Sequence, residues 1–132
     1  MTMSKDEVIK INIPLSPVSK KNHQQIRKNR ASGKRFVAPS QQYIDYENDA
    51  MWFIQDKGLM IDYPVNIKCL FYMPTKRKCD LTNMLEAIDD VLVEANVIAD
   101  DNFTILASHD GSRVLYDKNN PRTEVYITKF KE

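Results

Sequence analysis

Two stretches of the chain alternate apolar and polar residues, the pattern of strands with one buried face. The first extends from Val8 to Pro14, and the second, from Val65 to Met73, alternates without interruption. Two further apolar runs, Phe103–Ala107 and Thr123–Phe130, predict shorter strands, with a turn at Asp110-Gly111 between them. The alternation therefore predicts four strands.

Apolar residues recur at helical spacing in two other stretches. Ser40 is suited to cap a first helix that extends to about Lys57, where Gly58 ends it. A second helix is expected from about Thr82 to Asn96, with its apolar residues in one stripe. The aromatic residues of the first helix are assigned to its core-facing side or to a dimer contact: Tyr43, Tyr46, Trp52 and Phe53.

The resulting order, β-α-β-α-β-β, predicts an α/β protein of the α+β type, in which two helices pack on one face of a small mixed β-sheet. The 132 residues fit a single domain spanning 1–132, and a hydrophobic content of 42% can supply its core. Residues 16–40 are basic and poor in apolar side chains, and they are interpreted as a mobile loop.

Composition narrows the class of protein. No run approaches the roughly 18 apolar residues of a membrane helix, so no membrane partner is expected. The N-terminus is polar and unlike a signal peptide, which favours a cytoplasmic protein. Cys69 and Cys79 form no zinc-binding pattern, and Cys69, inside an apolar stretch, is expected to be a buried free thiol.

Charge is strongly polarised, although the net charge of the chain is only +1. Residues 1–40 contain nine basic and two acidic residues, a net of +7. Residues 80–110 contain no Lys or Arg, and their eight acids are Asp80, Glu86, Asp89, Asp90, Glu94, Asp100, Asp101 and Asp110. A fold that separates charge in this way requires a functional explanation.

The acids have a spacing that suits a metal centre. On the second helix Glu86 and Asp90 share the face opposite the apolar stripe, while Asp80 precedes the helix and Asp100-Asp101 precede the third strand. If the chain returns Asp101 to the Asp80 end, the carboxylates converge, and two of them about 4 Å apart repel by about 4 kcal/mol at an effective dielectric near 20. A hard divalent cation such as Mg²⁺ would relieve that repulsion.

A simpler interpretation accounts for the same residues. Acidic helix faces are commonly just solvated, Asp80 can be an N-cap, and Asp100-Asp101 can form a turn. Asp89 and Glu94 are assigned to the solvated face, and His109 is given no role.

The segment from Asp80 to Asp101 resembles the RusA family of Holliday junction resolvases. That family carries D-L-D-N, a helix and a twin aspartate before a strand; here Asp80-Leu81-Thr82-Asn83 begins the segment and Asp100-Asp101, 21 residues after Asp80, ends it. Pro17–Asn22 and the Ser-x-x-Tyr of Ser40 and Tyr43 also resemble the family.

The resemblance implies a homodimeric endodeoxyribonuclease that nicks branched DNA with Mg²⁺, or Mn²⁺, and needs no small-molecule cofactor. It implies metal binding by Asp80, Asp100 and Asp101, with Asp90 at a typical acidic position. Thr82 stands where the family has a second aspartate, and Glu86 where it has a catalytic lysine; we hypothesise that Glu86 restores the lost carboxylate as a catalytic and metal-binding residue. DNA contacts are expected from the basic segments: Lys20, Lys21, Asn22, Arg27, Lys28, Lys34, Arg35, Lys76, Arg77 and Lys78.

Two alternatives stay open. The departures at Thr82 and Glu86 are compatible with a junction-binding or regulatory protein whose active site has decayed. An acidic interaction module without a role on DNA is a third possibility.

Overall fold

The computed structural model describes residues 3–19, 25–38 and 40–131 of the chain. Its first half contains β1 (Val8–Ile13), β2 (Gln25–Lys28), β3 (Arg35–Ala38), α1 (Gln41–Ala50) and the 3-10 helix η2 (Met51–Phe53). Its second half contains β4 (Val65–Met73), α2 (Leu81–Glu94), β5 (Leu106–Ser108), β6 (Arg113–Tyr116) and β7 (Arg122–Lys129). In the described residues no helix is long and apolar enough to span a membrane.

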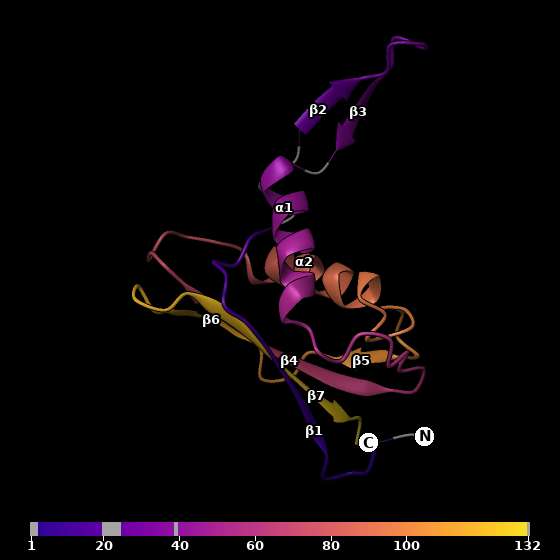
Figure 1. The fold of residues 1–132 in the computed structure, drawn as a ribbon, viewed down its shortest axis with the longest axis vertical. Coiled ribbons are helices and arrows are strands. Elements are labelled where there is room, and N and C mark those ends of the chain that lie inside the picture. Colours follow the sequence, from indigo (N-terminus) through magenta and orange to yellow (C-terminus); the bar gives the residue numbers. More distant parts are fainter. Residues whose placement is uncertain (1–2, 20–24, 39, 132) are drawn as a thin grey trace.

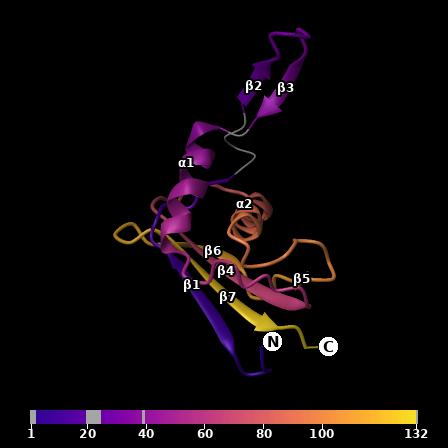
Figure 2. The same cartoon turned by 45° about the vertical axis from the view of Figure 1, so that its right-hand side comes forward.

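A five-stranded mixed sheet forms the centre of the fold. The long strand β7 runs antiparallel to β1 on one side and to β4 on the other. Along its opposite edge β4 pairs in parallel with β5 near its start and with β6 near its end. Both α-helices lie on one face of this sheet (Figure 1), as the view in Figure 2 also shows. The predicted fold class is confirmed.

Strand alternation explains the core. On β4 the inward residues Val65, Ile67, Cys69 and Phe71 are each at most 2% exposed. They face the apolar stripe of α2, which buries Met84, Ala87, Ile88, Val91 and Leu92. Complete burial of one large aliphatic side chain contributes about 1.5–3 kcal/mol, so this apolar layer contributes strongly to stability.

Cys69 is a buried free thiol, which confirms its predicted role. Its burial in the apolar layer raises the pKa of the thiol well above the ordinary value, with a smaller contribution from the charge of Asp89. The thiol is therefore protonated and unreactive at neutral pH.

The first helix ends earlier than its pattern predicted. Ser40 caps it as expected, with Oγ accepting a hydrogen bond from the Tyr43 N–H at 3.2 Å. After Ala50 the chain makes a single 3-10 turn and then extends at Ile54, which is 1% exposed. Leaving the helix is what buries Ile54. Of the aromatic residues, Tyr43 and Tyr46 are buried, whereas Trp52 is 85% exposed and does not belong to the core.

The third predicted strand, Phe103–Ala107, is placed wrongly in part. Residues 103–105 form a turn in which Asn102 O accepts from the Ile105 and Leu106 N–H groups, and the strand is β5, Leu106–Ser108. The short strand β6 was not predicted, because its four residues show no clear alternation and their pairing with β4 is non-local. The predicted turn at Asp110-Gly111 is present.

The basic segment 16–40 is not simply a loop, because its described part contains a two-stranded antiparallel hairpin of β2 and β3. The hairpin stands off from the body of the protein beyond α1 (Figure 1). Its turn is organised by Asn29, whose Oδ1 accepts from the Ala31 and Ser32 N–H groups, and by Gly33 at φ +72°. An Asx turn followed by glycine in the left-handed region is a recognisable hairpin signal.

Candidate active site

Asp80 begins α2 as its N-cap. Its Oδ1 accepts hydrogen bonds from the Thr82 N–H at 3.0 Å and from the Thr82 hydroxyl at 2.7 Å. Thr82, which stands where the resemblance implies a second aspartate, thus donates to Asp80. Asp80 is exposed, and a capping role leaves its carboxylate accessible to a ligand.

A tight turn before β5 presents Asp101. Asp100 accepts the Asp101 N–H with Oδ1 at 2.8 Å and the Asn102 side-chain amide with Oδ2 at 2.9 Å. The hydrogen bond from Asn102, followed by that of the Asp101 backbone, lowers the pKa of Asp100. Both oxygens of Asp100 therefore support the turn, while the adjacent Asp101 is exposed to solvent.

Asp80 is the N-cap of α2, whereas Asp101 lies in the segment that connects α2 to β5. The chain leaves the end of β4 to reach Asp80, runs back along α2, and then pairs beside the other end of β4. There Ala99 donates to the Ile61 carbonyl at 2.9 Å, and Leu106 pairs with Val65, the first residue of β4. The segment that carries Asp101 therefore leads to the start of β4, because a parallel crossover must travel back along the sheet, and the expected meeting of Asp101 with Asp80 stays a prediction.

The other acids of α2 separate into two environments. Glu86 and Glu94 are exposed, as a solvated face predicts. Asp90 is half-buried, and its charge contributes to raising the pKa of Tyr43 on α1, an effect due first to burial and then to Glu47. Asp89 points to the interior, contrary to its assignment to the solvated face.

Asp89 forms a half-buried pair with His109. The Asp89 Oδ2 atom lies 2.9 Å from His109 Nε2, and their side chains are only 14% and 20% exposed. His109 Nδ1 lies 2.7 Å from the Ile67 carbonyl oxygen on β4. Since a carbonyl can only accept, Nδ1 carries a hydrogen, and one further proton is shared between Nε2 and Asp89. No sequence signal could predict this pair, because it is made between distant segments.

Burial and pairing act together on both pKa values. Burial raises the pKa of Asp89; the hydrogen bond and charge of His109 oppose this, and the charges of Asp101 and Asp90 add to it, with a net increase. For His109, burial lowers the pKa, but the hydrogen bond and charge of Asp89 and the Ile67 carbonyl outweigh it, so its pKa is raised. An ordinary ion pair would lower the aspartate pKa; here burial dominates because the carboxylate is largely removed from water.

We expect the free energy of unfolding to fall as the pH rises above about 6.5, the ordinary pKa of histidine. The pKa of His109 is raised on folding, so in that window the folded state holds more protons at this group than the unfolded state, and the stabilisation is lost as pH passes the folded pKa. Urea unfolding in EDTA between about pH 6 and pH 9 measures the slope, given this pKa range. His109→Gln should flatten it; an unchanged slope in that variant contradicts the assignment.

Basic residues adjoin Asp80. Lys76, Arg77 and Lys78 are exposed in the loop between β4 and α2, and the Lys76 ammonium lies 5.1 Å from the centre of the Tyr116 ring. Beside this loop is a cleft of about 560 Å³ lined by Ser16, Pro17, Ser19, Gln42, Met73, Pro74, Thr75, Arg77, Lys78, Cys79 and Met84. The cleft extends from Cys79, which precedes Asp80, to Gln42 near the start of α1. The cationic side chains of Arg77 and Lys78 line it.

The remaining predicted DNA contacts lie on or near the hairpin. Lys28, Lys34 and Arg35 are exposed, and Arg27 belongs to β2. The predicted contacts Lys20, Lys21 and Asn22 lie outside the described residues.

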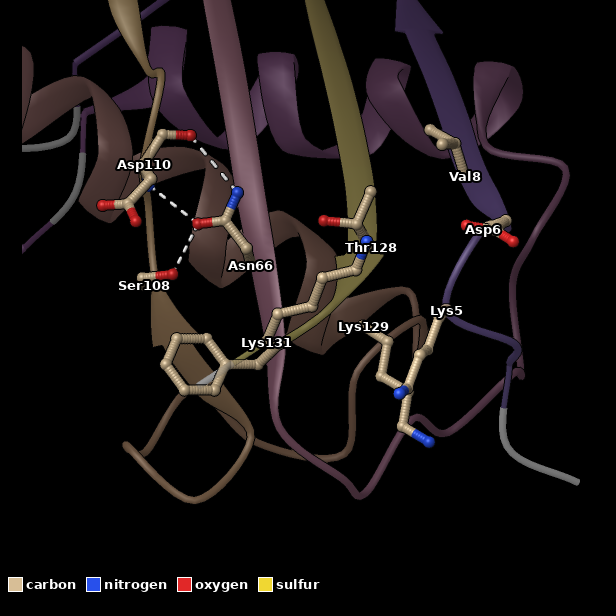
Figure 3. A pocket seen from close by; sticks show the side chains of 10 residues that line it. Lys5, Asp6, Val8, Asn66, Ser108, Asp110, Thr128, Lys129 and Lys131 are labelled. Atoms are coloured by element: carbon tan, nitrogen blue, oxygen red, sulfur yellow. Dashed lines mark hydrogen bonds between the residues drawn. The ribbon is translucent and has the colours of Figure 1, made fainter.

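A different hollow, of about 420 Å³, lies on the face of the sheet that the helices leave open (Figure 3). Its lining includes Lys5, Lys129 and Lys131, and Asn66, which exchanges hydrogen bonds with the Asp110 backbone. None of the predicted site residues lines it, so it is separate from the candidate active site.

Comparisons with known proteins identify the family of the chain. The family model described as Endodeoxyribonuclease RusA matches residues 14–128. The chain belongs to the RusA family. A crossover junction endodeoxyribonuclease RusA from Aquifex aeolicus (strain VF5) is 34% identical over 102 residues, which cover 76% of this chain and 77% of that protein. The RusA match includes the hairpin, α1, α2 and both aspartates.

The donor set suits a hard divalent cation in its chemistry, since Asp80 and Asp101 offer exposed carboxylates. Within the described residues, however, no three His, Cys, Asp or Glu side chains are grouped closely enough to hold a metal ion. Mg²⁺ is commonly held by one or two carboxylates together with substrate phosphate, so a RusA-family site does not require a preformed trio in one chain.

Proposed function

We propose that this RusA-family chain resolves four-way DNA junctions by paired, metal-dependent hydrolytic nicks. The observation that carries the proposal is the family match over residues 14–128, which encloses both Asp80 and Asp101. The related Aquifex aeolicus protein, named a crossover junction endodeoxyribonuclease, supports the same substrate.

Asp80 and Asp101 would hold the cation, and the turn that Asp100 braces would orient Asp101. A contribution to metal binding stays a prediction for Asp100, Glu86 and Asp90. Mg²⁺ or Mn²⁺ held there would supply an activated water and a positive charge beside the departing 3′-oxygen. The protein's own part is to fix the phosphodiester: cations on the hairpin and at Lys76–Lys78 bind the flanking phosphates, which makes affinity strongly dependent on salt.

The path of the chain from Asp80 along α2 to β5 supports a homodimer. One chain presents Asp80 at the N-cap of α2 and Asp101 in the segment that follows α2, so we propose that Asp80 of one copy and Asp101 of a second copy form one centre. Two-fold symmetry then produces two equivalent centres, which suits a substrate whose opposed strands are related by the same symmetry.

A non-catalytic junction-binding protein is the second candidate. The Thr82 hydroxyl donates to Asp80 where the family has a carboxylate, so one anionic ligand is missing. Glu86 is exposed on the next turn of α2, and its position supports the hypothesis that it replaces that ligand.

The two candidates predict different results with a labelled four-way junction. We expect symmetric nicks with Mg²⁺ or Mn²⁺, and no cleavage with EDTA, because hydrolysis needs the cation while phosphate binding does not. Denaturing gels measure nicking, and native gels run with EDTA measure binding. Binding without nicking at any metal concentration supports the non-catalytic candidate.

A further inference from the structure

We propose that Asp89 and His109 are positioning residues of the cleavage site, whose half-buried pair fastens the segment carrying Asp101 to α2. The inference rests on the proposed function and extends it to two residues outside the expected metal centre. It also explains why α2 has an inward-facing acid beside Asp90.

The pair joins three elements. Asp89 belongs to α2, His109 follows β5 directly, and Ile67 lies on β4. Through contacts of 2.9 Å to Asp89 and 2.7 Å to the Ile67 carbonyl, the imidazole bridges the helix and the sheet. Movement of either element relative to the other would break one of these contacts.

The segment that carries Asp101 needs the Asp89–His109 contact, because β5 alone pairs with β4 over a short and irregular stretch. β5 has three residues, and its register with β4 shifts between Val65 and Asn66. Asn66 also ties Asp110 to β4 (Figure 3), but among the described hydrogen bonds of residues 106–112 the His109–Asp89 bond is the one that reaches α2. Asp101, which precedes β5, is close enough for its charge to act on Asp89.

The arrangement is unfavourable as a purely structural device. Asp89 Oδ1 is buried and has no hydrogen-bond partner among the described residues. Leaving an acceptor unsatisfied costs stability, and apolar residues of similar size in place of a buried pair are often neutral or stabilising. Unsatisfied buried groups require an explanation, and holding the segment that carries Asp101 against α2 provides one.

Two variants separate the two hydrogen bonds of the imidazole. In His109→Asn the side-chain amide takes the place of Nδ1 and can still donate to Ile67, but it cannot reach Asp89. In His109→Gln the amide takes the place of Nε2 and keeps the Asp89 contact. Each variant loses one bond, so their thermal midpoints should fall by similar amounts. Asp117→Asn, which removes the charge from the 3.0 Å pair with Arg122 at the start of β7, is the control.

We expect His109→Asn to cleave a four-way junction up to about 100-fold more slowly than wild type, the loss typical of a reacting group displaced by about 1 Å. His109→Gln and Asp117→Asn should keep most of the wild-type rate. Junction affinity in EDTA should be unchanged in all three. Amide exchange of residues 98–106, measured without metal, should accelerate in His109→Asn alone.

Equal rates in the Asn and Gln variants overturn the inference, as does unchanged amide exchange in His109→Asn. The double variant Asp89→Leu with His109→Leu provides a second test: a folded protein that cleaves at the wild-type rate shows that the pair is only structural. A wild-type protein that binds the junction without nicking it overturns the proposed function as well, whereas a nicking wild type whose variants keep its rate overturns the positioning role alone.

Discussion

Asp80→Asn and Asp101→Asn should each reduce junction nicking by at least about 100-fold, since loss of even an indirect partner of a metal ligand commonly costs 10–100-fold. The amide is isosteric, so the N-cap at Asp80 and the turn at Asp101 are retained, and junction binding in EDTA should persist. Quantitative cleavage under single-turnover conditions measures the loss.

Mixing the two variants tests where the centre is built. If each centre combines Asp80 of one copy with Asp101 of another, a mixed dimer has one intact centre and one centre lacking both aspartates. It should therefore nick one strand of the junction. If both aspartates served within one chain, every centre would be defective and no activity would return.

The same assay distinguishes Glu86 from an ordinary surface acid. Glu86→Ala should slow cleavage if Glu86 replaces the carboxylate missing at Thr82. Glu94→Ala is the matched control, because Glu94 is equally an exposed glutamate of α2. Wild-type activity in Glu86→Ala eliminates the compensation hypothesis.

Phe71→Ala should lower the free energy of unfolding by about 3–5 kcal/mol, the usual cost of removing a buried phenyl ring. Phe71 is 2% exposed and lies on β4, the strand that pairs with both β6 and β7. The lost ring leaves a cavity that the surrounding strands cannot close. Urea unfolding at constant pH measures the change.

Phe103→Ala is the matched control for that measurement. Phe103 is 84% exposed in the turn before β5, so its truncation should change stability by no more than about 0.5 kcal/mol. A similar loss in both variants would contradict the assigned core.

The patterns of apolar and polar residues predicted much of the fold, because strand and helix periodicity depend on residues that are close in sequence. The alternation over Val65–Met73 matches β4 in full, since period-2 burial depends on the strand alone. The stripe of α2 matches to within two residues at each end for the same reason. The shorter α1 could not be predicted, because the burial of Ile54 that ends it depends on contacts with distant residues.

Among the site residues, Asp80 and the twin aspartate could be identified from the sequence. Asp80 directly precedes the predicted helix and Asp100-Asp101 precede the predicted strand, and the spacing between them resembles that of the family. Glu86 and Asp90 on one face of α2 follow from helical periodicity. The hairpin in residues 16–40 was missed, although Asn29 and Gly33 mark its turn.

By itself, then, the sequence determined the strand and helix faces, the separation of charge and the family, because these depend on periodicity, composition and spacing. Only the tertiary structure decided that β5 lies parallel to β4 and that Asp89 faces inward to His109. The physical reason is that strand direction and helix packing minimise the free energy of the whole chain, through contacts between residues that no local pattern relates.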